Sequence, residues 1–302
     1  MAENNPLARR GFLSIVGGAA GIAALTSVAA GQQQQTDYET SSGVSVEHIG
    51  RYSSSAEFDE GGAEISAYAP SAERLFVTNG AEKNIDVLDI SDPTNPTKAD
   101  SIDVGTSPKD GATNVSVVEK DGDEVVVAAV ENDDTQANGW VLFFSANDGS
   151  KINEIEVGPL PDCVTVTDDG NYALTANEGE PTDDYSTDPA GSVSIVDLSS
   201  GIANANTSTA GFTKYDEQEE ELRQRGIRIY GNNDNSSASQ DLEPEYIATA
   251  NGTAYVTLQE NNALAIIDIA NAEITDLKAL GYKDFSLPNN ALDAIEGEEI
   301  NF

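Results

Sequence analysis

The stretch Tyr172–Asn177 (YALTAN), followed after a polar loop by Ser192–Ser199 (SVSIVDLS), decides the fold of this 302-residue chain. Each part is a short run of small and β-branched residues, which is typical of a β-strand. The loop between them is rich in Gly, Asp, Ser and Thr, which indicates a turn. The two runs therefore predict a β-hairpin whose second strand ends near the acidic residue Asp197.

The same plan occurs three more times along the chain. The other hairpins run from 75–79 to 85–91, from 125–130 to 140–145, and from 254–258 to 263–269. Equivalent positions Asp89, Phe144, Asp197 and Asp268 lie 55, 53 and 71 residues apart. A further short strand precedes each hairpin, for example at 163–167 or 246–249, and another follows most of them, for example at 151–157. Four strands per unit with this repeat length are typical of β-propeller blades.

We therefore expect an all-β chain, a β-propeller-like array of about four to five four-stranded antiparallel blades. Weak strands at 44–69 would supply a partial first blade, and a polar insertion at about 200–240 would lengthen the third repeat. Within that insertion, the charged stretch Tyr215–Arg225 is compatible with a short helix. A β-sandwich is the alternative architecture, but it does not explain the recurring hairpin.

The N-terminal region predicts export. Arg9 and Arg10 precede a short Gly/Ala-rich apolar run, which is typical of a twin-arginine signal peptide over residues 1–30. Small residues at 28–30 predict cleavage there, and a non-cleaved anchor is the alternative. A polar linker at 31–43 would then lead into the domain at 44–302, with no transmembrane helix in the mature chain. This organisation places the protein at the cell surface or outside the cell.

The composition is strongly acidic. The chain has 53 Asp and Glu residues against 15 Lys and Arg, a net charge of -38, and these acids are spread along its whole length. Such self-repulsion is largely screened in molar salt, so the composition favours a haloadapted protein. It argues against nucleic-acid binding, because no basic patch is present. With a single histidine, His48, and a single cysteine, Cys163, most Ser-His, Cys-His and multi-histidine zinc sites are excluded.

A family resemblance rests on residues 175–198 (TANEGEPTDDYSTDPAGSVSIVDL), supported by segments at 241–247, 255–264 and 283–288. Over roughly residues 44–300 the chain resembles the choice-of-anchor I family of secreted β-propeller-like proteins. Members are usually longer at the C-terminus, which implies a short propeller that closes as a small ring, pairs with another chain, or stays open. Some relatives carry alkaline phosphatase or phytase-like labels, so the resemblance also implies a possible esterase activity.

Two acidic clusters are candidates for a metal site. They are Glu178, Glu180, Asp183 and Asp184 in the loop of the third hairpin, and Asp241, Glu243 and Glu245 before the fourth. Carboxylate oxygens are the ligands that Ca²⁺ prefers, and it takes six to eight of them. If both clusters face the same mouth of the propeller, they could form a joint Ca²⁺ site. The alternative is that they are solvated loops of an acidic protein.

Two functions follow from these patterns. The first is a binding or interaction protein without an evident catalytic centre, whose partner is an unidentified protein, glycan or small molecule, or a second copy of the chain. The alternative is a metal-dependent phosphoesterase, in which Lys109 and Arg74 would neutralise the phosphate oxygens. No phosphate-binding glycine loop or nucleophile elbow accompanies them. Triplets for N-glycosylation begin at Asn114, Asn206, Asn235 and Asn251.

Overall fold

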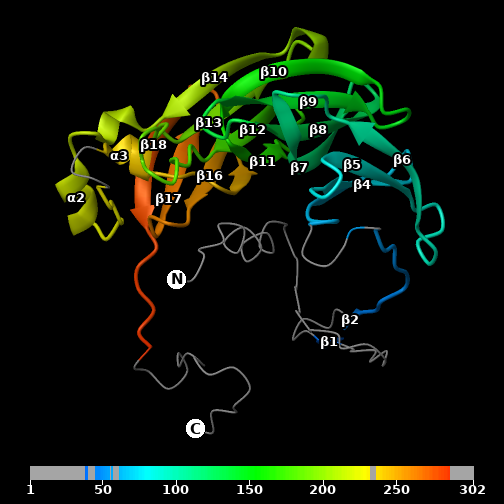
Figure 1. Ribbon diagram of the computed structural model, residues 1–302, viewed down its shortest axis with the longest axis horizontal. Coiled ribbons are helices and arrows are strands. Elements are labelled where there is room, and N and C mark those ends of the chain that lie inside the picture. The colour runs from blue at the N-terminus through cyan, green and yellow to red at the C-terminus, as the bar shows by residue number, and fades with distance from the viewer. Residues whose placement is uncertain (1–37, 40–44, 55, 57–60, 232–235, 286–302) are drawn as a thin grey trace, which may run out of the picture.

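The computed structural model describes residues 38–39, 45–54, 56, 61–231 and 236–285. In this part of the chain, four sheets follow one another, and each is a four-stranded antiparallel meander. They lie along an arc in the order of the sequence (Figure 1). The predicted all-β, β-propeller-like array of four-stranded blades is therefore confirmed.

The strands of the first two sheets have the following bounds. Sheet 1 contains β3 (Ser66–Ala69), β4 (Arg74–Asn79), β5 (Asn84–Asp89) and β6 (Thr97–Asp103). Sheet 2 contains β7 (Lys109–Lys120), β8 (Asp123–Asn132), β9 (Asn138–Ser145) and β10 (Lys151–Pro159).

The remaining elements are these. Sheet 3 contains β11 (Pro161–Val166), β12 (Tyr172–Asn177), β13 (Ser192–Asp197) and β14 (Asn206–Gly211). Sheet 4 contains β15 (Ile247–Ala250), β16 (Thr253–Leu258), β17 (Ala263–Asp268) and β18 (Glu273–Ala279). Short helices are η1 (Ile202–Asn204), η2 (Thr213–Tyr215), α2 (Glu219–Gln224) and α3 (Ala238–Asp241). Two-residue strands β1 (Tyr38–Glu39) and β2 (Ser45–Val46) pair with each other.

Residues 44–69 do not form the separate partial blade that the sequence predicted. Their last residues form β3, which is the first strand of the complete sheet 1. Sheet 1 thus takes its four strands from residues 66–103, and the described chain contains four four-stranded sheets.

Apolar side chains fill the space between successive sheets. Side chains alternate between the two faces of a strand, so neighbouring residues of β8 serve different interfaces. Val126 packs toward sheet 1 and Val127 toward sheet 3. In β12, Ala173 joins the core shared with sheet 2, whereas Leu174 joins the core shared with sheet 4. This two-sided burial explains why the central strands are nearly continuous apolar runs.

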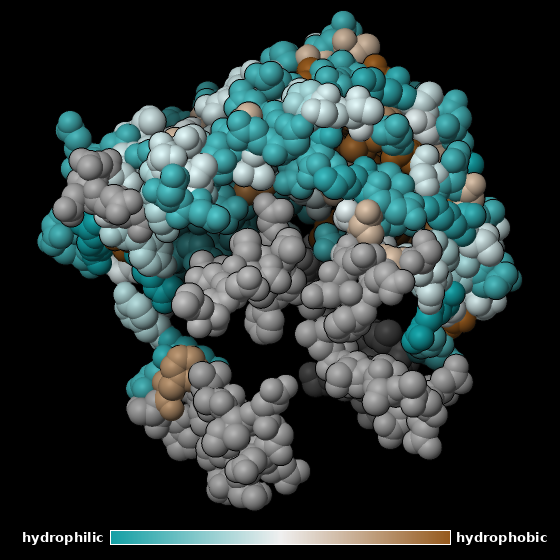
Figure 2. Space-filling model, viewed as in Figure 1, coloured by the Kyte–Doolittle hydropathy of each residue, from teal (hydrophilic) through white to brown (hydrophobic). Residues whose placement is uncertain are grey.

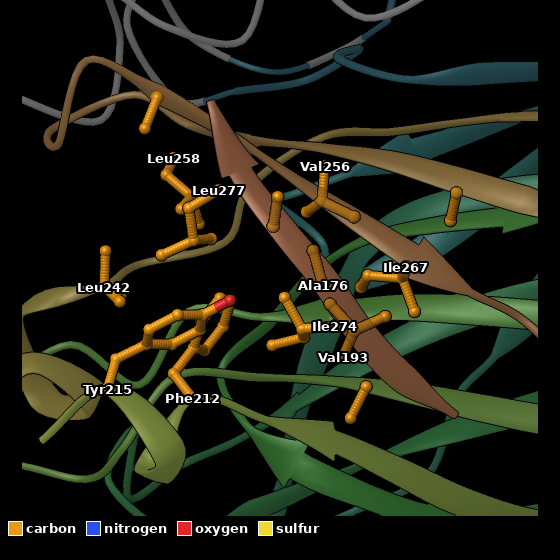
Figure 3. Packing of buried hydrophobic residues seen from close by; sticks show 14 of the residues in the cluster. Ala176, Val193, Phe212, Tyr215, Leu242, Val256, Leu258, Ile267, Ile274 and Leu277 are labelled. Carbon is orange, nitrogen blue, oxygen red and sulfur yellow. The ribbon is translucent and has the colours of Figure 1, made fainter. Parts of the chain in front are cut away.

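The polar insertion contains more structure than its composition suggests. Strand β14 lies within it, and α2 confirms the short helix expected in Tyr215–Arg225. Its few apolar side chains, including Phe212 and Leu222, are fully buried against the core between sheets 3 and 4. Figure 3 shows Phe212, Tyr215 and Leu242 beside residues of the two sheets. The insertion therefore closes one end of this core.

The described residues on the face seen in Figure 2 are mostly hydrophilic, with a few apolar side chains among them. Among the described residues, no helix is long and apolar enough to span a bilayer.

Candidate functional site

The loop that carries the first acidic cluster begins where β12 ends. The buried Asn177 side chain donates hydrogen bonds to Ser192 Oγ at 3.1 Å and Ser194 Oγ at 2.9 Å, so it ties β12 to β13 at the mouth of the loop. Glu178 follows, and its backbone N–H donates to the carbonyl of Leu160 at 2.9 Å. These bonds fix where Glu178 leaves the sheet.

This loop, residues 178–191, docks on the segment that leads into sheet 4. The Gly191 N–H donates to the Ser239 carbonyl at 2.9 Å, and Gln240 Nε2 donates to the Asp188 carbonyl at 2.7 Å. A Cβ atom at Gly191 would lie only 2.0 Å from the carbonyl oxygen of Leu242. Glycine is therefore required for the two backbones to come this close.

The second acidic cluster is held by the turn between β16 and β17. The fully buried Asn261 donates from Nδ2 to the Asp241 carbonyl at 2.6 Å and accepts the Glu243 N–H at 3.3 Å. Glu245 is 7% exposed, and its carboxylate accepts a hydrogen bond from Gln259 Nε2. Glu243 and Glu245 are thereby fixed beside the docked loop.

Carboxylates of the two clusters lie close enough to raise one another's pKa values. Burial, and then the negative charges of Asp162 and Glu245, raise the pKa of Glu178 well above its usual range. Burial, followed by the charges of Glu260 and Glu180, raises the pKa of Glu243 to about 8. Burial and the charge of Asp162 raise the pKa of Glu245 to about 7, although the hydrogen bond from Gln259 opposes this.

The three glutamates whose pKa is raised have no ion-pair partner among the described basic residues. None of the ion pairs formed by the described residues includes Glu178, Glu243 or Glu245. The described residues also hold no group of three or more His, Cys, Asp or Glu side chains placed closely enough for metal binding. The arrangement is thus a partly buried set of mutually repelling carboxylates. Burial and mutual repulsion of this kind favour the protonated form of the carboxyl groups.

Three of the predicted metal-site residues lie apart from this set. Asp183 and Asp184 are exposed at the tip of the loop. Asp184 forms the turn there, since its Oδ1 accepts the Ser186 N–H at 3.0 Å, and its pKa is lowered by hydrogen bonds from Ser186. Asp241 is buried, but its carboxylate accepts the Gly231 N–H at 2.6 Å and so faces the insertion.

The sequence did not point to three further acidic residues whose charges raise the pKa of Glu178 or Glu243. They are Asp162, Asp188 and Glu260. Asp162 lies in β11, next to the position that pairs with Asn177, so knowledge of the strand register would have located it. Burial and the charge of Asp241 raise the pKa of Asp188.

The two cations considered for phosphate binding are engaged within the protein. Lys109 Nζ lies 3.1 Å from Glu154 Oε1 and 4.3 Å from the ring centre of Trp140. Arg74 donates to the backbone carbonyls of Ala146 and Asn147. A cavity of about 490 Å³ lies between sheets 1 and 2, away from the acidic clusters. Lys109 is one of the residues that line it.

The remaining candidate residues have clear positions. Cys163 is buried, and burial raises the pKa of its thiol to about 12, in keeping with a structural role. Asn114 is only 5% exposed, which leaves no room for a glycan in the folded chain. Asn206 and Asn251 are exposed. Asn235 and the predicted signal residues Arg9 and Arg10 lie outside the described residues.

Comparison with known proteins gives a family and distant structural likenesses. The family model of the choice-of-anchor I domain matches residues 64–302, which confirms the resemblance found in the sequence. None of the curated proteins matches the chain.

Among solved structures, the chain is similar to hydrazine synthase of Kuenenia stuttgartiensis, with 16% identity, a TM-score of 0.38, and coverage of 68% of this chain and 64% of that one. It is also similar to a chain of a nidogen/laminin complex, with 14% identity, a TM-score of 0.45, and coverage of 79% and 69%. The likeness to the β-propeller domain of Cps50 (Swd1) from Myceliophteria thermophila has 10% identity, a TM-score of 0.46, and coverage of 73% and 56%. The chain thus spans less than two thirds of the length of the first and the third of these chains.

Proposed function

Because the chain belongs to the choice-of-anchor I domain family over residues 64–302, we propose that it is an exported, haloadapted binding protein of the cell surface or extracellular space. The twin-arginine pattern at Arg9 and Arg10 supports export. The net charge of -38, spread over the whole chain, supports a working environment of high salt.

The proposed binding site rests on one observation. At the junction of sheets 3 and 4, two loops that are more than 60 residues apart in the sequence place four glutamates where their charges affect one another's pKa values. These glutamates are Glu178, Glu180, Glu243 and Glu245. No three acidic side chains of the described residues lie close enough to coordinate a metal together, so in this proposal one or two carboxylates and several water molecules would supply the six to eight oxygen ligands of a bound Ca²⁺. In this proposal Asp183, Asp184 and Asp241 shape the loops and do not bind the ion.

The partner of such a module is an unidentified protein, glycan or small molecule at the cell surface. Self-association is a further possibility that the proposal includes. Nucleic acid is not a partner, because clustered carboxylates repel phosphate.

The alternative function is a metal-dependent phosphoesterase. It requires positive groups at the metal site to stabilise the phosphate. Lys109 and Arg74 bond to other protein groups at a different junction, so no contact of theirs supports it. The binding function is therefore the better supported of the two.

Calorimetric titration of the full chain with Ca²⁺ in about 2 M KCl tests the proposal, since molar salt screens non-specific attraction to the acidic surface. We expect saturable binding that the double variant E243Q/E245Q weakens at least tenfold. The matched control E220Q/E221Q removes two exposed carboxylates from α2 and should bind normally. Equal affinity in all three proteins would contradict the site. Chelator-sensitive release of phosphate from p-nitrophenyl phosphate by the same sample would instead support the phosphoesterase.

A further inference from the structure

Four triplets of the chain have the pattern that N-glycosylation requires, an asparagine followed two residues later by serine or threonine. The binding function proposed above does not use them. Three of these triplets begin at described residues, namely Asn114, Asn206 and Asn251. Their surroundings in the fold differ, so the structure distinguishes them as acceptors of a glycan.

The Asn114 side chain is not accessible in the folded chain. Asn114 lies in β7 opposite Ala129 of β8, and it is only 5% exposed. A transferase could reach it only before sheet 2 forms. A glycan on Asn114 would therefore indicate that transfer precedes folding.

The Asn206 triplet is exposed, but all of it lies within β14. Its three residues pair in register with three consecutive residues of β13. A transferase has to bind the whole triplet as a peptide segment. To do so here, it would have to separate β14 from the rest of sheet 3.

The Asn251 triplet begins in a turn. Asn251 and Gly252 form the two-residue connection between β15 and β16, and their φ angles are 52° and 78°. Two residues with positive φ form the hairpin turn for which Asn-Gly is the preferred sequence. Both residues are exposed, and no atom beyond the neighbouring residues lies within 4 Å of the position that a Cβ of Gly252 would take. The turn therefore projects into open space.

Thr253 supplies the hydroxyl group of this triplet. It is the first residue of β16 and is half-buried, and its pairing with Ala250 closes the turn. In the described part of the chain, no hydrogen bond engages the side chain of Asn251 or that of Thr253. The acceptor nitrogen and the hydroxyl group are thus both available while the hairpin stays paired.

We propose that Asn251 is the N-glycosylation site of the folded, exported chain. The co-reactant is an oligosaccharide carried on a lipid phosphate. Nδ2 of Asn251 forms a bond to the anomeric carbon of the sugar and releases one proton. The bond from that carbon to the phosphate oxygen breaks, and the lipid phosphate leaves with the electron pair. This modification rests on the export included in the proposed function, because the transferase acts on chains that have crossed the membrane.

Peptide mass spectrometry of the full chain, produced in its own host and recovered from the cell envelope and the medium, tests this site. We expect a glycan on the peptide that contains Asn251 and none on the peptides that contain Asn114 and Asn206. N251D removes the acceptor nitrogen, and it should lower the glycosylated fraction at least tenfold. Aspartate tolerates the same positive φ, so the turn should remain.

A matched pair of variants at Thr253 tests the hydroxyl group separately. T253A leaves Asn251 in place but removes the hydroxyl, so it should lower the glycosylated fraction at least tenfold. The control T253S keeps a hydroxyl and should remain glycosylated. Far-ultraviolet circular dichroism checks that each variant is folded.

The outcomes separate this site from the function on which it rests. An exported chain without a glycan on Asn251 overturns the proposal, and so does a glycan that T253A retains. A glycan on Asn114 overturns it too, because transfer would then precede folding. A chain that stays inside the cell overturns both the site and the exported function.

Discussion

Replacing Glu245 by glutamine should stabilise the protein at alkaline pH and have little effect at acidic pH. Glu245 is 7% exposed, and its pKa in the folded chain is about 7, against an ordinary value of 4.5. A carboxyl group with a raised folded pKa destabilises the fold as pH rises above the unfolded pKa, and the cost is complete above the folded pKa. The sensitive window is therefore pH 4.5 to 7.

The size of the effect follows from the same two values. Each pH unit between them is worth about 1.4 kcal/mol, so the ceiling is about 3 kcal/mol at pH 9. Water and structural relaxation lower the cost of a buried charge, so we expect a gain of about 2 kcal/mol in the free energy of unfolding for E245Q. At pH 5 the gain should be below about 1 kcal/mol.

Urea unfolding of the chain and of E245Q, in molar KCl with a chelator, measures this difference at pH 5 and pH 9. The control E220Q removes an exposed carboxylate and should change stability by less than about 0.5 kcal/mol at both pH values. An E245Q variant no more stable than the parent at pH 9 would refute the electrostatic reasoning. So would an equal gain at both pH values, because it would have to come from packing.

The remaining predictions concern how the sheets are joined. G191A should destabilise the fold by about 2–4 kcal/mol in urea unfolding, because its methyl group would meet the Leu242 carbonyl, and parental stability would show that the loop is not docked. E124A should cost about 2 kcal/mol, because the Glu124 carboxylate accepts the N–H groups of Ser71–Ala72 at 2.9 and 3.0 Å; no change in the urea midpoint would contradict this clamp between sheets 1 and 2. Cys163 should react with Ellman's reagent at pH 8 only after unfolding, and rapid labelling of the folded chain would contradict its burial.

The repeated hairpin was sufficient to predict the architecture. Short β-branched runs at regular spacing identified the second and third strands of all four sheets, because these strands bury at least one apolar face. Those of sheets 2 and 3 are buried on both faces and are therefore strongly apolar. The outer strands were harder to recognise. Strands β6 and β14 are mostly exposed, so their sequences lack an apolar signal, and β14 was included in a polar insertion.

The candidate site was predicted only in part, for a reason of geometry. A sequence shows that Glu178 and Asp184 lie near each other along the chain, but the direction in which each side chain leaves its loop depends on the backbone. Asp184 turns back on its own loop to accept the Ser186 N–H, whereas Glu178 leaves the end of β12 toward the next sheet. Asp162 could not be identified without the register of β11 against β12.

Comparison of two junctions shows how the balance of charge differs between them. At the junction of sheets 1 and 2, the turn after β4 supplies Lys83, which pairs with Asp110 at the start of β7, and this contact raises the pKa of Lys83. The equivalent places at the junction of sheets 3 and 4 follow β12 and precede β15, and there they hold glutamates on both sides. The repeat thus brings charged side chains together in both places: at the first an acid meets a lysine, and at the second the described glutamates face one another. Since burial makes like charges costly, the pKa values of Glu178, Glu243 and Glu245 are raised at the second junction, and protonation relieves the repulsion there.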